Sequence, residues 1–186
     1  VCSCWRWLTL LTVVCKPSPT TVNNRKPPST PMNFGIALGS NLGDRAENLR
    51  RGVALLRERV PGLVVRASAP VYETDPVECA PGTQAFLNTV IEVEASLTPR
   101  EFHAHLQGVE QALGRPAARE KNSPRSLDLD LLYAGDLISD DPALILPHPR
   151  LHQRRFVLQP LADIRPDLVL PGQSVPVFRL LSQLSE

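Results

Sequence analysis

The residues with the clearest chemical potential lie in the segment from Pro124 to Tyr133, where acids and leucines alternate. A β-strand sends successive side chains to opposite faces, so Asp128 and Asp130 share one face and the leucines share the other. Two neighbouring carboxylates repel each other unless a cation lies beside them, and hard oxygen ligands suit Mg²⁺. Arg125, just upstream, carries a planar donor suited to phosphate oxygens. Together these groups favour a phosphoryl-transfer site.

This strand and three further motifs also have structural interpretations. Acid–leucine alternation is typical of a solvated, amphipathic edge strand as well. Phe86 and Asn88 share a strand face and suit a planar heterocycle, but a core phenylalanine beside a turn-bonded asparagine has the same spacing. The basic residues between 115 and 125 form either a phosphate-binding loop or a solvated surface. His148, between two prolines, is either a phosphate ligand or an exposed histidine.

Composition restricts the class of protein. A chain of 186 residues suffices for one domain with a full core but not for two large ones. A formal net charge of +1 lacks the marked basic excess of a bulk nucleic-acid binder. Of the four cysteines, only Cys79 lies beyond residue 31, which argues against a disulfide framework. This usage fits a reducing compartment, so we predict a cytoplasmic location.

The first 31 residues differ in composition from the remainder. Residues 1–15 are apolar and tryptophan-bearing, residues 16–31 are polar and rich in proline and threonine, and the single methionine, Met32, directly precedes a strand pattern. We therefore expect residues 1–31 to be disordered or not part of the native protein, and residues 32–186 to form one domain. The alternative is a targeting segment, although no small-residue cleavage site follows its apolar stretch. That stretch is too short to span a bilayer.

Helix and strand signals outline the elements that must position these groups. Asp44 with Glu47 and Thr98 with Glu101 are helix-start signatures, and apolar residues follow each at helical spacing. The predicted core elements are a strand at 33–39, a helix at 44–60, a strand at 63–69 that continues past a proline to 74, a strand at 86–95, a helix at 98–113 and the acid–leucine strand.

This strand–helix–strand–strand–helix–strand order is typical of an α+β fold of the ferredoxin-like kind, with two helices on one face of an antiparallel sheet. C-terminal additions are expected to complete it: a short strand at 137–138, a helix around 151–156, a segment at 158–164 and a terminal helix at 175–184.

Five motifs occur in an order and spacing that resemble the hydroxymethyldihydropterin pyrophosphokinase family. They are Gly39–Asp44, Tyr72–Thr74, Phe86–Asn88, Pro124–Asp130 and Pro147–Arg150. The resemblance runs from about Met32 to about Pro171, and its Pro-Arg-x-Leu-Asp-x-Asp element is highly specific. It implies an enzyme that transfers pyrophosphate from ATP to the hydroxymethyl group of a dihydropterin, releasing AMP, in folate biosynthesis.

The family pattern also implies site residues. Asp128, Asp130 and Arg125 are the predicted catalytic residues, the two aspartates holding two Mg²⁺ ions. The set matched to the pterin consists of Thr74, Val77, Phe86, Asn88 and Phe156, with the rings of Phe86 and Phe156 on either side of it. The set matched to ATP consists of Gln107, Glu110, Arg115, Lys121, Arg125, His148 and Arg154.

The chain departs from the family pattern in the loop over ATP. Members often carry an aromatic residue where Asn122 stands and an arginine where Ala117 stands, and Arg119 is a candidate to replace the missing charge. These departures put affinity and turnover in question more than the reaction. The expected partners are ATP and the dihydropterin, with no nucleic acid, no membrane and a monomeric protein.

Two rival classes share parts of this pattern. An RNA recognition motif has the same element order, but it stacks bases on aromatic residues of its first and third strands and prefers a basic face. Here Phe34 is the only aromatic residue of the first predicted strand. In addition, the paired acids would repel the phosphates of RNA unless a metal is bound. The second rival is a pterin-binding relative without catalysis, which the presence of Asp128, Asp130 and Arg125 disfavours.

Overall fold

A computed structural model of the chain describes residues 7–8, 30–76, 82–114 and 124–184. Its strands are β1 (Trp7–Leu8), β2 (Met32–Ser40), β3 (Val64–Ser68), β4 (Val71–Thr74), β5 (Phe86–Ala95), β6 (Asp128–Ala134), β7 (Ser139–Asp141) and β8 (Leu144–Leu146). Its helices are α1 (Arg45–Arg59), α2 (Pro99–Ala112), α3 (Arg155–Ile164) and α4 (Val177–Gln183), with a 3₁₀ turn, η1 (Leu151–Gln153), before α3. No helix within the described ranges is long and apolar enough to cross a membrane.

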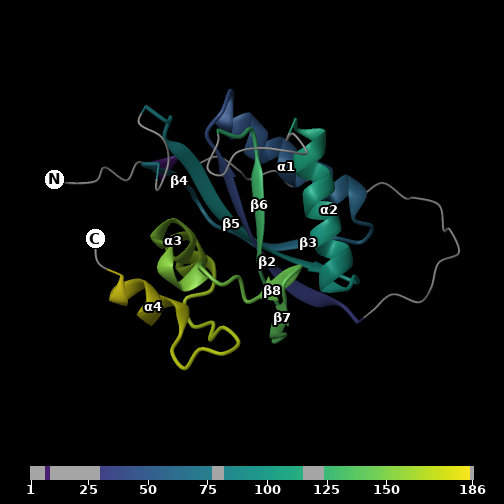
Figure 1. Cartoon of the computed structure of the whole chain (residues 1–186), viewed down its shortest axis with the longest axis vertical. Coiled ribbons are helices and arrows are strands. Elements are labelled where there is room, and N and C mark those ends of the chain that lie inside the picture. The colour runs from purple at the N-terminus through teal and green to yellow at the C-terminus, as the bar shows by residue number, and fades with distance from the viewer. Residues whose placement is uncertain (1–6, 9–29, 77–81, 115–123, 185–186) are drawn as a thin grey trace, which may run out of the picture.

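The main sheet is antiparallel and has the strand order β1-β4-β5-β2-β6, with β3 pairing with β5 next to β4. Figure 1 shows α1 and α2 side by side, while α3 and α4 lie together nearer the C-terminus. The first strand of the ferredoxin-like core, β2, therefore lies between the third and fourth, β5 and β6. The predicted α+β fold with two helices on one face is confirmed.

Local sequence chemistry starts both core helices where it was predicted to. The Asp44 side chain accepts a hydrogen bond from the backbone N–H of Glu47 at 3.0 Å. At α2, Thr98 and Glu101 cap each other reciprocally, and Pro99 occupies the first turn. The buried stripe of α2 begins with Phe102, whose ring stacks on that of Phe34 with centroids 4.2 Å apart. The stacked rings fix α2 against β2.

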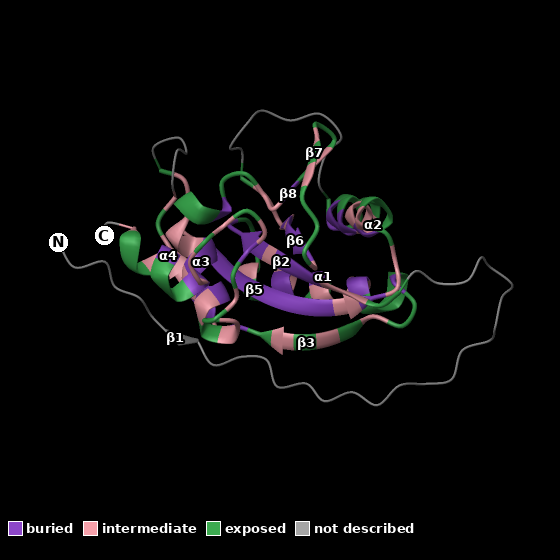
Figure 2. Ribbon diagram, turned by 90° about the horizontal axis from the view of Figure 1, so that it is seen from below, coloured by how far each residue is buried: buried purple, intermediate pink, exposed green. Residues whose placement is uncertain are grey.

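The sheet has apolar side chains on both faces, because a separate layer of helices covers each. Leu87, Ile91 and Val93 of β5 pack with α1 and α2, whereas Val90 packs with α3 and α4. Figure 2 shows the result, with β2 and β5 mostly buried in the middle of the molecule. This division leaves one end of the second face for the polar side chains of the site.

A β-bulge in β6 interrupts the acid–leucine alternation. Ile36 pairs with Leu131, but Gly35 pairs with Tyr133, so Leu132 is an extra residue without a partner opposite it. Leu132 and Tyr133 consequently both join the core under α3, whereas Leu131 faces α1 and α2. The Leu132 carbonyl instead accepts a hydrogen bond from the backbone N–H of His148 at 2.8 Å. The bulge thus anchors the proline-rich loop beside β6.

Buried polar contacts hold α3 against the sheet. Glu92, only 3% exposed, accepts hydrogen bonds from the hydroxyl of Tyr133 at 2.7 Å and from Arg165 at 2.8 Å. The Tyr133 ring lies directly over Gly35, where a Cβ atom would come within 2.1 Å of it. These contacts fix the end of α3, and the start of the same helix carries Arg154 and Phe156 toward the site.

Three sequence predictions of the elements were wrong in detail. The strand predicted from 63 to 74 is divided into β3 and β4, because Pro70 has no N–H to offer the ladder. The short strand predicted at 137–138 instead begins at Ser139 and pairs with β8. The helix predicted around 151–156 is the turn η1 followed by α3, which begins at Arg155 and includes the separate segment expected at 158–164.

The strand β1 pairs Trp7 with Tyr72 and Leu8 with Val71 at the outer edge of β4. Two residues of pairing contribute little beside the cores, which lie between residues 32 and 184. We therefore expect a protein that begins at Met32 to keep its fold and its turnover. Thermal unfolding and steady-state kinetics of the two forms would measure this, and a large loss in the shorter form would show that residues 1–31 are needed.

Candidate active site

One row of side chains crosses the sheet from the proposed heterocycle contacts to the carboxylates. Asn88 of β5 is directly opposite Gly39 of β2, which is directly opposite Asp128 of β6. Directly opposite residues project on the same face of a sheet. The next row on that face places Asp130 opposite Ala37. Small residues on β2 therefore separate the amide from the carboxylates and leave the surface between them open.

Gly39 keeps this surface open because a side chain there would collide with its neighbours. A Cβ atom at Gly39 would lie 2.8 Å from Oδ1 of Asn88, 3.9 Å from the Phe86 ring and 4.0 Å from Cβ of Asp128. The same amide donates from Nδ2 to the hydroxyl oxygen of Thr74 at 2.7 Å. Thr74 thus fixes the rotamer of Asn88 and leaves its carbonyl oxygen directed over the glycine.

Each carboxylate lies beside an arginine, and each arginine lies over a phenylalanine. Arg125 Nη1 is 2.8 Å from Oδ2 of Asp128, and its guanidinium carbon is 5.6 Å from the centre of the Phe86 ring. Arg154 Nη1 is 3.4 Å from Oδ2 of Asp130, and its guanidinium carbon is 5.5 Å from the Phe156 ring centre. The two cations offset the repulsion expected between the acids.

Arg125 has an unused donor on this face. Its Nε atom is buried and makes no hydrogen bond to any other part of the described chain. A buried donor without an acceptor is costly, so an incoming anion that supplies one would be favoured. A guanidinium with a free N–H beside a carboxylate is suited to phosphate oxygens.

The proline-rich loop brings His148 to the same region. Burial lowers the pKa of His148, an effect that Asp130 opposes and Arg154 adds to. The ring is therefore neutral at pH 7, with its Nδ1 accepting a hydrogen bond from the N–H of Arg150 at 3.2 Å. Burial also lowers the pKa of Arg154.

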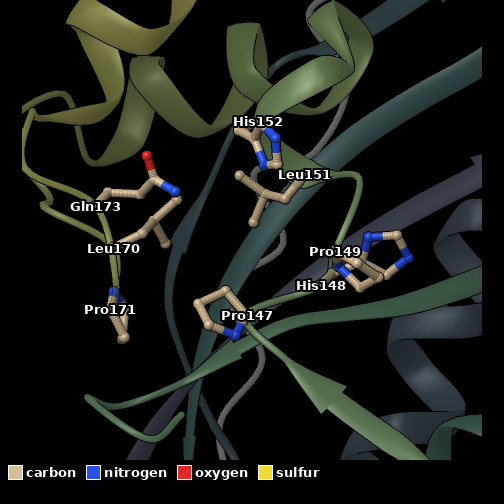
Figure 3. Close-up of a pocket in the computed structure, with 8 residues that line it drawn as sticks. All are labelled: Pro147, His148, Pro149, Leu151, His152, Leu170, Pro171 and Gln173. Carbon is tan, nitrogen blue, oxygen red and sulfur yellow. The ribbon is translucent and has the colours of Figure 1, made fainter. Parts of the chain in front are cut away.

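A hollow of about 150 Å³ lies behind His148. Figure 3 shows His148 and Pro149 on one side of it and Leu170 and Pro171 on the other. Its walls contain neither aspartate and neither of the two phenylalanine rings, so it adjoins the candidate site without forming part of it.

Two predicted ATP residues lie on the side of α2 that faces the edge strand β6. Glu110 is 3% exposed, and its Oε1 accepts a hydrogen bond from the backbone N–H of Leu129 at 2.9 Å. Gln107 is exposed and contacts Nε2 of His103 at 3.1 Å. Glu110 therefore has a structural role, since it accepts a hydrogen bond from an edge N–H between Asp128 and Asp130.

The structure describes eleven of the fourteen predicted site residues. Those described are Thr74, Phe86, Asn88, Gln107, Glu110, Arg125, Asp128, Asp130, His148, Arg154 and Phe156. Val77, Arg115 and Lys121 lie outside the described residues, as do the departures Ala117 and Asn122. Gly39 and Asn41 were not among the predicted site residues, although both belong to the Gly39–Asp44 motif. The available signals in the sequence were a glycine at the end of a predicted strand and a polar residue shortly after that strand.

The donor set suits Mg²⁺ that is bound together with a nucleotide. Among the described residues there is no cluster of three histidine, cysteine or acidic side chains. Mg²⁺ commonly takes one or two carboxylates and completes its shell with water and substrate phosphates. The paired carboxylates of Asp128 and Asp130 fit that pattern.

An antiparallel sheet that presents paired acids and arginines on its open end defines the class as a phosphoryl-transfer enzyme. Comparison with protein families gives the particular one: the model of 7,8-dihydro-6-hydroxymethylpterin-pyrophosphokinase (HPPK) matches residues 35–166. The chain therefore belongs to this family of pyrophosphokinases, which act on hydroxymethyldihydropterin in folate synthesis.

Individual relatives agree with the family. The 2-amino-4-hydroxy-6-hydroxymethyldihydropteridine pyrophosphokinase of Bacillus subtilis is 45% identical over 130 residues, which cover 69% of this chain and 75% of that enzyme. The enzyme of the same name from Pseudomonas aeruginosa is 39% identical over 144 residues, covering 76% of this chain and 86% of that enzyme.

Longer proteins match as well. The folic acid synthesis protein fol1 of Pneumocystis carinii is 40% identical over 136 residues, which cover 73% of this chain but 18% of that protein. The solved structure of wild-type Plasmodium falciparum HPPK-DHPS with pteroate has a TM-score of 0.64 at 13% identity. It covers 86% of this chain, and the chain spans 43% of it, so this likeness supports the fold alone.

Proposed function

We propose that this chain transfers pyrophosphate from ATP to the hydroxymethyl oxygen of 6-hydroxymethyl-7,8-dihydropterin, with two Mg²⁺ ions, and releases AMP. The observation that carries the proposal is the row Asn88–Gly39–Asp128, in which an amide and a carboxylate lie on one open face. In the proposal, the amide binds the edge of the heterocycle and the carboxylate binds the metal. In the reaction, the hydroxyl oxygen attacks the β-phosphorus while the bond from that phosphorus to the α–β bridging oxygen breaks. The hydroxyl proton is lost, and AMP takes the bridging oxygen.

The charged residues contribute positioning and charge neutralisation, which dominate phosphoryl transfer. Asp128 and Asp130 would hold the Mg²⁺ ions, whose chemistry is to neutralise the triphosphate and polarise its phosphoryl oxygens. Arg125 and Arg154 would turn from the carboxylates to phosphate oxygens. In the proposal Gln107, His148 and the undescribed Arg115 and Lys121 also contact ATP.

The aromatic residues and the amide would bind the second substrate. An arginine side chain lies over each of the two rings, Arg125 over Phe86 and Arg154 over Phe156. In the proposal the pterin replaces these arginines as the contact of the two rings. Asn88 supplies an acceptor and a donor for the edge of the heterocycle, and Thr74 holds it in place. Thr74 and Val77 are proposed to contribute backbone groups to the same edge.

The proposed setting of the enzyme is the cytoplasm, where it acts as a monomer on two small molecules. The absence of a basic excess and the cysteine usage support this setting. Sedimentation at working concentration would test the monomer.

The reaction is tested by separating nucleotides after adding 6-hydroxymethyl-7,8-dihydropterin to the protein with ATP and Mg²⁺. We expect AMP to form in equal amount to the pyrophosphorylated pterin, with none formed when either Mg²⁺ or the pterin is omitted. Formation of ADP instead would indicate transfer of a single phosphoryl group. RNA binding that ignores Mg²⁺, with no nucleotide turnover, would favour the RNA-binding alternative.

Phe86→Ala should weaken pterin binding by about 1–3 kcal/mol through lost stacking and burial. ATP affinity should change much less, and calorimetry with a pterin and with an ATP analogue would compare the two. The matched control is Phe178→Ala. The Phe178 ring also lies beside an arginine, with the guanidinium carbon of Arg179 5.2 Å from its centre, but it lies on α4 outside the site. Equal losses for both ligands would show that Phe86 acts as a core residue.

A further inference from the structure

Asn41 is a buried polar residue in the turn between β2 and α1, with 1% of its surface exposed. It forms a two-bond clamp on the segment before β6. Its backbone N–H donates to the Arg125 carbonyl at 3.1 Å, and its side-chain Oδ1 accepts from the Arg125 N–H at 2.8 Å. The clamp holds the main chain of Arg125, the residue whose guanidinium lies between Asp128 and Phe86.

The other half of the same amide reaches the segment before β5. Nδ2 of Asn41 donates to the Gln84 carbonyl at 3.5 Å, two residues before Phe86. Arg45, at the start of α1, adds a second bond to this segment, from Nη1 to the Ala85 carbonyl at 2.7 Å. The turn after β2 therefore touches both segments that lead into the proposed site, one on the pterin side and one on the phosphate side.

We infer that Asn41 is a positioning residue that links the pterin-side segment to the phosphate-side segment; the inference rests on the proposed function. The side-chain amide supplies both the acceptor that the Arg125 N–H uses and the donor that the Gln84 carbonyl uses. A shift of one segment on ligand binding changes the bond that holds the other. Binding of a pterin should therefore change the affinity for the nucleotide, and by linkage the reverse holds equally.

Two substitutions distinguish the two side-chain hydrogen bonds of Asn41, one with the Arg125 N–H and one with the Gln84 carbonyl. Asn41→Asp keeps the acceptor for the Arg125 N–H but replaces the donor to Gln84 with an oxygen. Asn41→Leu removes both. Asn48→Ala is the control, because the Asn48 side chain bonds within the same turn, to the Leu42 carbonyl at 2.8 Å, and to neither segment.

Calorimetry would measure the affinity for a Mg²⁺-bound, non-hydrolysable ATP analogue with and without a pterin analogue. In the unchanged protein and in Asn48→Ala we expect the pterin to alter nucleotide affinity by about fivefold or more, the lower range of allosteric coupling. In Asn41→Asp and Asn41→Leu the two affinities should agree within about twofold, well below that coupling range. Coupling that persists in Asn41→Leu would overturn the inference.

Hydrogen exchange at the Arg125 amide gives a readout that needs no ligand. It should be slow in the unchanged protein and in Asn41→Asp, and faster in Asn41→Leu. Unchanged exchange in a folded Asn41→Leu protein would show that Asn41 does not hold this segment. If the unchanged protein bound neither ligand, the proposed function would fail, and the exchange result would still decide the role of Asn41.

Discussion

Replacing Asp128 or Asp130 with asparagine should lower turnover by about 10³-fold or more, the scale on which loss of a preorganised charge acts on a transition state. Each change keeps the shape of the side chain and removes one charge from the proposed metal site. Excess Mg²⁺ should restore little, because a lost ligand changes geometry as well as affinity. Steady-state AMP release would measure the loss.

Stability in these variants should change little. The alternation of acids alone predicts that removing one charge raises stability, since like charges on one strand face repel. The structure corrects this expectation, because Arg125 and Arg154 already lie beside the carboxylates. Losing one such partly exposed ion pair should cost at most about 1 kcal/mol, which urea unfolding can detect.

Asp141→Asn is the matched control for both aspartates. It removes an aspartate–arginine pair, with Arg100 at 2.5 Å, that lies on β7 away from the site. Turnover in this control should be unchanged. If Asp128→Asn or Asp130→Asn kept more than about a tenth of the normal turnover, a barrier change under ~1.4 kcal/mol, that carboxylate would not be an essential ligand.

Arg125→Met should act in opposite directions on the two charged ligands. Removing the cation takes away the ion pair between Arg125 and Asp128, so affinity for Mg²⁺ alone should rise. Affinity for the Mg²⁺-bound ATP analogue should fall, because the guanidinium that would meet the phosphates is gone. Turnover should fall by about 10²-fold or more, as expected when one stabilising donor is lost.

Two calorimetric titrations, one with MgCl₂ and one with the ATP analogue in saturating Mg²⁺, would separate these effects. Arg100→Met removes an exposed arginine from an equivalent pair with Asp141 and should alter neither affinity. A parallel fall in both affinities for Arg125→Met would instead indicate that Arg125 supports the local fold.

Local chemistry explains why much of the core could be predicted. The caps at Asp44 and Thr98 act within one turn, so their spacing is visible in the sequence. The face of each residue in β5 and in the first half of β6 follows from a period of two and from apolar side chains that must be buried. The five quoted motifs then located most of the candidate site.

Contacts between distant segments could not be predicted in the same way. The bulge at Leu132 depends on how β6 registers with β2, and the sequence of β6 alone does not show which residue lacks a partner. The pairing of Arg125 with Asp128 is local, but that of Arg154 with Asp130 requires α3 to dock against the sheet. The link made by Asn41 spans 84 residues and appears only when the loops are folded together.

The row through Gly39 sets a fixed distance across the site. Asn88 and Asp128 are separated by two strand spacings, or about 10 Å, and this span is fixed by backbone hydrogen bonds. Side-chain substitutions cannot easily lengthen or shorten it. A heterocycle gripped at Asn88 would present its hydroxyl to the phosphates only if its side arm had the matching reach. The spacing of the strands would thus select a heterocycle with a one-carbon arm over one with a longer arm.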